Sequence, residues 1–418
     1  MIEKDYEKNI KLYKVYKMFS YDLIFYYSIY ILFYTITKKL TMSEVMYISA
    51  SYSFFAFIWQ IPVNYIIEKI GLKKVLIIGR VLVVIDMIGY IVSNSMFEFM
   101  FFDIFGALGW GMCGVAESSI LYSSLKKIGK KDEFSKLEGK SLSLYYYYDA
   151  ITALLSGFLF VFNNYLPMIL CIFNVVIGLV VACYFVDIKN EDEGKVFSFK
   201  DETKQFFEIL HLKRSKSILL FTLIFAGIIA VGKKMYNSIL IDLQVEEQYI
   251  AVILSFVTMF VGLGSKYTYK FENYAKNKTL TIYCIVYIIS IIFIGFIGLT
   301  NELDLFTLSM YMIFLILICM VTGSYTVAIK KYVFNFTTHE VRTKVTSLYY
   351  FFKYFGEVIF LIISGIILEN NTNSISTIIF GILAGIVCFI CLYYMKDKIG
   401  LNAKDYDEKE VYMNENKK

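Results

Sequence analysis

Long apolar runs recur along nearly the whole of this sequence. A run of about 20 apolar residues is what an α-helix needs to cross the hydrocarbon core of a bilayer. Only helices and closed β-barrels satisfy their backbone in lipid, and these runs are too long for barrel strands. Hydrophobic residues make up 58% of the 418 residues and charged residues 18%, which excludes an ordinary soluble domain. The sequence therefore predicts an all-α membrane protein.

Polar breaks divide the apolar runs into twelve predicted transmembrane helices, in two groups of six. The first group covers residues 18–37, 43–67, 75–95, 97–123, 142–163 and 165–187. The second group covers residues 217–241, 248–266, 279–300, 304–329, 344–368 and 374–395. The domains we predict are an N-terminal half (1–187), a cytoplasmic linker (188–216), a C-terminal half (217–395) and a cytoplasmic tail (396–418). Two pseudo-symmetric six-helix bundles follow from this division.

The basic residues predict the orientation of the spans. With a cytoplasmic N-terminus, the outside loops contain only Lys38 and Lys39 of the 41 Lys and Arg residues. Because short cytoplasmic loops are enriched in basic residues, we predict that both termini are cytoplasmic. The N-terminal residues lack the apolar core and cleavage site of a signal peptide. We therefore expect a multi-pass protein of the cell inner (plasma) membrane that keeps its first span.

A short acidic and basic motif lies between the second and third predicted spans, where residues 64–74 read N-Y-I-I-E-K-I-G-L-K-K. An acid at a helix end is followed by a turn that glycine permits and by cations that face the inner leaflet. The motif resembles the signature of the major facilitator superfamily, commonly written G-x-x-x-D-R-x-G-R-R/K, with asparagine in place of the first glycine. The resemblance implies that the acid helps to latch span 2 against span 11. The residues of this expected conformational latch are Asn64, Glu68, Lys69, Gly71, Lys73 and Lys74.

The resemblance extends over nearly the whole chain. Residues 121–139 resemble the loop after span 4 in bacterial members related to drug exporters. Glycines within 106–114 resemble the motif R-x-x-x-G-x-G of drug–proton antiporters, with Phe105 at the arginine position. The antiporter motif G-P-x-x-G-G is absent, and Ser156-Gly157 is its nearest remnant. The resemblance implies a transporter that works by alternating access, in a drug-exporter-like group, with incomplete antiport motifs.

Ionisable side chains lie within the predicted spans. Each one costs on the order of 3 kcal/mol at the centre of a helix in lipid, so most must face a watery cavity or one another. This cost indicates a polar pathway independently of the family resemblance. The residues that we singled out are Asp22, Asp86, Asp103, Glu117, Asp149, Lys233, Lys234, Lys353 and Glu357.

Glu117 and Asp149 are predicted at similar depth on two helices joined by one loop. Two acids that share a site can hold a proton between them, as a proton carrier requires. The alternative is that each acid pairs with lysines of the inner loops. A second pair, Lys353 and Glu357, is four residues apart on one helix face, so it forms an intrahelical ion pair or faces the pathway. A weak internal repeat, S-L-Y-Y at 143–146 and 347–350, aligns Asp149 with this second pair.

Lys233 and Lys234 are predicted about two-thirds of the way outward along the span at 217–241. A buried lysine there binds an anionic substrate or forms a salt bridge with an acid such as Asp103. Asp86, on the third span, is expected to have a structural partner. The residues that we predict for the substrate or proton pathway are Glu117, Asp149, Lys233, Lys234, Lys353, Glu357 and Asp103.

Other classes of function lack their motifs. The chain has no G-x-x-x-x-G-K-[ST] loop for ATP, no clustered catalytic residues of a membrane enzyme, and no cysteine spacing of a disulfide framework or metal site. We therefore predict no enzyme activity, no cofactor, no metal and no nucleic-acid partner. The predicted function is proton-coupled efflux of a small amphipathic compound by a monomer. The alternatives are uptake of a small metabolite, which can be anionic, and a non-transporting sensor or assembly factor with a transporter fold.

Overall fold

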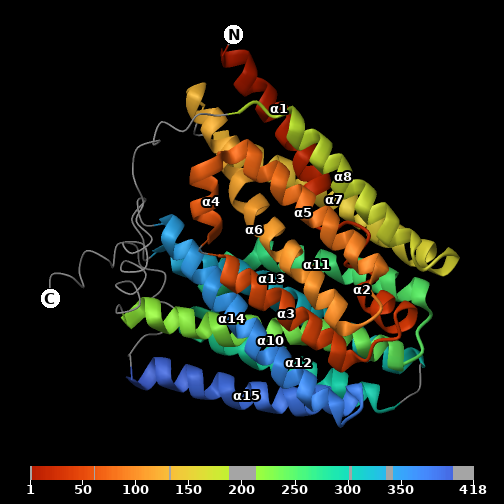
Figure 1. Cartoon of the computed structure of the whole chain (residues 1–418). Helices are drawn as coiled ribbons and strands as arrows, with labels where there is room; N and C mark the ends of the chain where they lie inside the picture. The colour runs from red at the N-terminus through yellow and green to blue at the C-terminus, as the bar shows by residue number, and fades with distance from the viewer. Residues whose placement is uncertain are drawn as a thin grey trace. The chain divides into compact units, whose positions relative to one another are not determined.

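The computed structural model describes residues 2–60, 62–130, 133–187, 213–300, 304–335 and 342–398 (Figure 1). Every regular element in these residues is a helix. The all-α fold predicted from the apolar runs is therefore confirmed. Most of the predicted linker and tail lies outside the described residues.

The helices of the N-terminal part are short at first and then long. They are α1 (Ile2–Ser20), α2 (Tyr30–Leu32), the π-helix η1 (Phe33–Thr37), α3 (Met42–Trp59), α4 (Pro62–Ile70), α5 (Leu72–Val92), α6 (Met96–Lys127), α7 (Phe134–Phe162) and α8 (Leu166–Tyr184). From α5 onward each helix agrees with one predicted span.

The helices of the C-terminal part follow their predicted spans closely. They are α10 (Lys213–Asp242), α11 (Glu247–Ala275), the short 3₁₀ turn η3 (Lys276–Lys278), α12 (Thr279–Gly298), α13 (Leu305–Asn335), α14 (Arg342–Glu369) and α15 (Asn373–Lys398). Nine helical segments of the described residues are long and apolar enough to cross a membrane, and one of them, Glu247–Gly298, contains both α11 and α12. Together with the irregular first and second spans, these helices are consistent with a twelve-helix fold.

The first predicted span, 18–37, is not one helix. Helix α1 occupies the preceding polar segment and ends at Ser20, and turns lead from there to α2 and η1. Two long polar side chains of α1 are buried: Asn9 is 0% exposed and Lys17 is 2% exposed. Asn9 donates a hydrogen bond to the carbonyl of Val186 at 3.0 Å and accepts one from its N–H at 2.7 Å. The polar stripe of α1 is therefore part of the protein core, which the hydropathy pattern does not reveal.

The second predicted span, 43–67, is divided at Pro62. Proline has no backbone N–H and its ring restricts the residue before it, so a helix is commonly broken at this position. Helix α3 ends at Trp59 and α4 begins at Pro62. Helix α4 ends at Ile70, where Gly71 has a φ of +84°, a conformation that side chains with a Cβ rarely adopt. Gly71 thus makes the turn expected of it.

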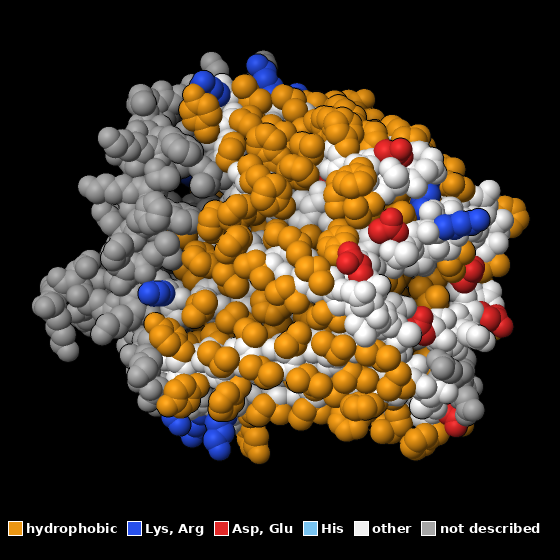
Figure 2. Space-filling view, turned by 60° about the horizontal axis from the view of Figure 1, so that its bottom comes forward, with side chains coloured by type: hydrophobic (Ala, Val, Ile, Leu, Met, Phe, Trp, Pro, Cys, Tyr) orange, Lys and Arg blue, Asp and Glu red, His pale blue; other side chains and the backbone are white. Residues whose placement is uncertain are grey.

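Helix α5 shows how these helices are suited to lipid. Its charged residues Arg80 and Asp86 are 0% and 1% exposed. After the exposed Lys74 in its first turn, its exposed side chains recur every three or four residues and are aliphatic: Ile78, Val81, Ile85, Ile88 and Val92. A soluble helix has the opposite arrangement, with apolar residues inside and charges outside. Hydrophobic side chains likewise cover much of the face shown in Figure 2, and its acidic side chains gather on the right-hand side.

The chain forms two compact units. Unit 1 contains Met1–Thr41, Ser51–Lys195 and Glu247–Ser255, and unit 2 contains Met42–Ala50, Val196–Glu246 and Phe256–Lys418. In unit 1, α5 packs against α6 and α8, and α1 packs against α6, α7 and α8. In unit 2, α10 packs against α14 and α12 packs against α15. Each unit contains its own group of interacting charged side chains.

Candidate functional site

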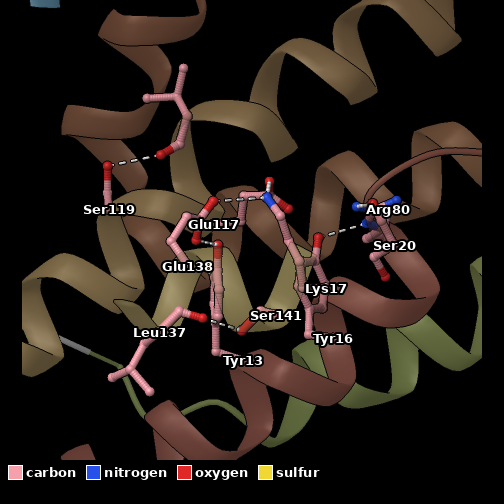
Figure 3. Close-up of polar contacts among 11 residues, drawn as sticks. Tyr13, Tyr16, Lys17, Ser20, Arg80, Glu117, Ser119, Leu137, Glu138 and Ser141 are labelled. Atoms are coloured by element: carbon pink, nitrogen blue, oxygen red, sulfur yellow. Dashed lines mark hydrogen bonds and ion pairs between the residues drawn. The ribbon is translucent and has the colours of Figure 1, made fainter. Parts of the chain in front are cut away.

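Unit 1 contains a buried ion cluster where α1, α6 and α7 meet (Figure 3). The Lys17 ammonium of α1 donates to Glu117 Oε1 of α6 and lies 3.4 Å from Glu138 Oε1 of α7. The Lys17 and Glu117 side chains are only 3% and 9% exposed, whereas that of Glu138 is 26% exposed. One buried cation is therefore shared by two carboxylates, and one of these is open to solvent.

Tyr13 of α1 completes the contacts of the second acid. It lies four residues before Lys17, so the two side chains share one helix face. Its hydroxyl donates to Glu138 Oε2. Burial, together with the negative charges of Glu117 and Glu138, raises the pKa of the Tyr13 phenol, so the hydroxyl remains a donor at physiological pH. Consecutive turns of α1 thus supply the donor and the cation of the cluster.

Arg80 of α5 brings a second cation close to the cluster. It is fully buried; its Nε donates to the Tyr16 hydroxyl at 2.7 Å and its Nη2 donates to the Ser20 carbonyl. The guanidinium lies 5.0 Å from the ring centroids of Tyr16 and Trp110. Its positive charge acts electrostatically on Glu117. Lys17 and Arg80 balance the charges of Glu117 and Glu138, so a proton added to either acid leaves the cluster with one excess positive charge.

A cavity of about 400 Å³ lies beside this cluster in unit 1. Tyr13 makes a side-chain hydrogen bond with Ser118, one of the residues that line the cavity. The volume falls in the range of small-molecule sites, about 300–1,000 Å³. Hydroxyls and apolar side chains share its wall, which consists of Ile67, Leu72, Ser118, Ser119, Tyr122, Ser123 and Phe134.

Unit 2 has a separate charged group on α10 and α14. Lys353 Nζ lies 3.7 Å from Glu357 Oε1, and it also lies 5.2 Å from the ring centroid of Tyr354. The charge of Glu357 acts on Lys234 of α10, while the adjacent Lys233 is exposed. The structure therefore brings together four of the predicted pathway residues, and the intrahelical ion pair is formed.

The other predicted pathway residues lie in unit 1. Asp149 is half-buried on α7, where its charge acts on Tyr145. Glu117 interacts with Lys17, Arg80 and Glu138. Asp103 is fully buried and accepts a hydrogen bond from Tyr90 at 2.5 Å.

The residues of the expected latch surround the turn at Gly71. Lys69 Nζ lies 4.5 Å from the ring centroid of Tyr65. Lys73 is half-buried and Lys74 is exposed at the start of α5. The side chains of Asn64 and Glu68 lie outside the described residues, so the latch stays a prediction.

The sequence pattern did not single out Lys17, Glu138 or Arg80. Lys17 belongs to a segment that hydropathy assigns to the cytoplasm, and Glu138 to a polar loop. The sequence did contain a signal for Lys17. Asn9, Tyr13 and Lys17 follow one another at intervals of four residues, which places them along one face of α1. Arg80 stands inside the apolar run at 75–95, so the rule applied to the other intramembrane charges would have identified it.

Buried charge clusters and aliphatic faces on long helices together indicate a polytopic membrane protein. The sequence profile of the Major Facilitator Superfamily matches residues 18–333, which is more than half of the chain. The protein belongs to the major facilitator superfamily. Its membrane location and its class as a transporter of small molecules follow from this membership.

Solved structures of other transporters share the fold. The nucleoside transporter NupG is similar with a TM-score of 0.78 and 11% identity, over 93% of this chain and 99% of that chain. The POT family transporter PepTSo has a TM-score of 0.67 and 10% identity, over 95% and 98% of the two chains. A POT family transporter in complex with 5-aminolevulinic acid has a TM-score of 0.64 and 14% identity, over 93% and 94%. No curated protein matches the sequence. At these identities the similarity shows the fold alone.

Proposed function

We propose that this transporter exports a small amphipathic compound in exchange for protons. The observation that carries the proposal is the ion cluster of Lys17, Glu117 and Glu138 beside the cavity in unit 1. In this cluster the partly exposed Glu138 shares the cation of the buried Lys17–Glu117 pair, so the charge on Glu138 is coupled to the contacts between α1 and α7. The drug-exporter-like features of the sequence support export as the direction.

The charge of the cluster gives protonation a structural consequence. When Glu138 is ionised, it accepts from Tyr13 and faces Lys17, so α7 is tied to α1. A proton on Glu138 removes its charge and weakens both contacts, because hydrogen bonds to ionised groups are the stronger ones. A coupling ion must favour one of two conformations in this way. Each proton that moves down 100 mV supplies about 2.3 kcal/mol.

The wall of the cavity supports an amphipathic substrate. Ser118, Ser119 and Ser123 offer hydroxyls, whereas Phe134 and Leu72 offer apolar surface. Pockets that bind small molecules typically combine a mostly apolar wall with a few polar groups that fix orientation. With both termini cytoplasmic, as the basic residues predict, the cavity lies near the cytoplasmic face, where an export substrate enters.

The test is dye accumulation in efflux-deficient cells that express wild type or the Glu138→Gln variant, with and without a protonophore. We expect wild type to lower accumulation and the protonophore to abolish this effect. Glu138→Gln keeps the shape but removes the titratable charge, so its export should no longer respond to the protonophore. Glu98→Gln, an exposed acid at the start of α6, is the matched control and should behave as wild type. Equal accumulation in all cells, over a broad dye panel, would exclude export of such compounds.

A second candidate function is uptake of a small anionic metabolite. Lys233, Lys234 and Lys353 lie together with Glu357 on the adjoining helices α10 and α14. A group of cations on adjoining helices favours an anionic ligand. Under this alternative, substrate binds to unit 2, and the cluster of unit 1 serves stability.

Flux into liposomes tests the uptake function. We expect Lys234→Gln to raise the KM for a labelled organic anion about tenfold, which corresponds to the loss of roughly 1.4 kcal/mol of binding. Lys270→Gln removes an exposed lysine of α11 and should leave KM unchanged. An equal effect of both substitutions would argue for general surface charge instead of a site. Absence of flux for both amphipathic and anionic probes would favour the sensor function.

A further inference from the structure

Two acids of unit 1 are buried together away from the Lys17 cluster. Asp86 on α5 is 1% exposed and Asp103 on α6 is 0% exposed. The Asp86 carboxyl lies against Gly106, one turn after Asp103, where a Cβ would overlap with it. The charge of Asp103 acts directly on Asp86. The two carboxyl groups therefore share one enclosed site between α5 and α6.

Tyrosine side chains form the polar surroundings of this pair. The Tyr90 hydroxyl donates to Asp103 Oδ1 at 2.5 Å, and the ring centroids of Tyr34 and Tyr90 are 6.1 Å apart. The hydroxyls of Tyr34 and Tyr26 are 2.9 Å apart. Both acids act electrostatically on Tyr34 and Tyr90. A row of phenol groups from η1 and the preceding turn thus leads to the acid pair.

Asp103 has hydroxyl partners in Tyr90 and Ser51, but in the described part of the chain one oxygen of each acid lacks a donor. Asp86 Oδ1 and Asp103 Oδ2 are buried and have no hydrogen-bond partner among the described residues. The ionisable groups that face Asp86 are Asp103, Tyr34 and Tyr90, with Cys171 on α8. None of these groups is a cation. Arg80, on the same helix, directs its hydrogen bonds to Tyr16 and Ser20.

Two ionised carboxylates are not stable in such a place. Moving one carboxylate into a low-dielectric interior costs several kcal/mol even after relaxation, and a second like charge adds repulsion. A buried acid without a cation takes up a proton instead. A protonated carboxyl has an O–H donor, so one proton supplies the donor that the two orphan oxygens lack.

We infer that Asp86 and Asp103 form a buried proton-binding site that holds one shared proton, bounded by the hydroxyl row of Tyr90, Tyr34 and Tyr26. The ligand is a proton rather than a metal cation, because the Asp86 carboxyl packs flush against the backbone of α6 at Gly106 and a cation needs several oxygen ligands around it. The site stands independently of the export proposed above. It assigns a role to Asp86, which the sequence pattern left as structural.

Infrared spectroscopy of the purified full-length protein in liposomes tests the site. A protonated carboxyl group has a C=O stretching band that is distinct from that of a carboxylate and shifts in D₂O. We expect this band in wild type at pH 7, and we expect the Asp86→Asn/Asp103→Asn double variant to lose it. Glu98→Gln, an exposed acid on α6, is the control and should keep the band. Absence of the band in wild type, or its persistence in the double variant, would overturn the assignment.

Tyr90→Phe provides a second variant that leaves both acids in place. It removes the hydrogen bond to Asp103 Oδ1, so the C=O band should keep its intensity and move to a higher frequency. An unchanged band position would contradict the assignment, and this result does not depend on whether the double variant folds.

A sodium ion is the other ligand that two carboxylates could bind. It is tested by comparing the stability of wild type in sodium chloride and in choline chloride. If the pair bound a metal cation, wild type would lack the C=O band, and sodium but not choline would stabilise it.

Discussion

Replacement of Lys17 by methionine is expected to lower the free energy of unfolding by about 3 kcal/mol at neutral pH. Methionine fills a similar volume without the charge, so Glu117 remains buried, with its side chain 9% exposed, and loses the cation that it contacts. Removing one partner of a buried ion pair typically costs about 3–5 kcal/mol, because the other charge is left uncompensated. Arg80 lies close enough to act on Glu117, which places the expected loss at the lower end. Thermal unfolding of the purified protein in detergent measures the change.

A double-mutant cycle separates the ion pair from other effects of the substitution. Lys17→Met combined with Glu117→Gln removes both charges, so most of the stability should return, with a coupling energy of about 2 kcal/mol. Lys353→Met is the matched control, because its ion pair with Glu357 is intrahelical and its side chain is 33% exposed. Partly exposed pairs contribute less than about 1 kcal/mol. A loss for Lys17→Met no larger than the loss for Lys353→Met would show that the cluster in unit 1 has no special energetic role.

The hydropathy pattern predicted most helices because their lipid-facing stripes dominate it. Helix α5 was predicted at 75–95 and lies at Leu72–Val92, since its exposed side chains from Ile78 onward are aliphatic. The pattern failed for α1, whose buried face carries Asn9 and Lys17. A hydropathy window assigns such a helix to water, although partners on other helices bury it. The break at Pro62 was predictable from proline geometry alone.

Whether a pair of charged residues could be predicted depends on the separation of its members in the sequence. Lys353 and Glu357 are four residues apart, so helical geometry alone places them together. Lys17 and Glu117 are separated by 100 residues, and no local pattern pairs them. The nearness of Asp86 and Asp103 was equally invisible, because it depends on how closely α5 packs against α6. The sequence could identify the intramembrane charges as costly, but only packing decides which of them meet.

Helix α6 links the two buried sites of unit 1. Asp103 and Glu117 are fourteen residues apart on it, a separation of about 21 Å along the helix axis. Glu117 is held by cations, whereas in the described part of the chain the polar groups that meet Asp103 are hydroxyls and another acid. Two acids on one helix therefore have opposite electrostatic surroundings: cations lie beside Glu117, and another acid lies beside Asp103. A proton on Asp103 removes a charge that is costly to bury, while a proton on Glu117 removes one that is compensated.

Gly356→Ala is expected to destabilise the protein by about 1–2 kcal/mol. Helix α10 crosses α14 at this residue, and a Cβ on Gly356 would overlap with the backbone carbonyl of Leu223. Opposite it, a Cβ on Gly227 would lie 2.7 Å from the Gly356 carbonyl oxygen. Alanine gains about 1 kcal/mol over glycine in a helix, but overpacking typically costs about 1–3 kcal/mol. The overpacking cost should exceed the gain here, because the overlapping atom belongs to the backbone and α10 must move as a whole.

Gly262→Ala on α11 is the control with the opposite sign. A Cβ at Gly262 meets no atom within 4 Å, so only the helix propensity acts, and we expect a gain of about 0.5–1 kcal/mol. Thermal unfolding of both variants in the same detergent measures the contrast. If Gly356→Ala is as stable as Gly262→Ala, the helices do not approach as closely as this packing requires. If it is destabilised as expected, α10 and α14 form a tight pair, and Lys234 and Glu357 are held near each other by backbone contact rather than by their charges.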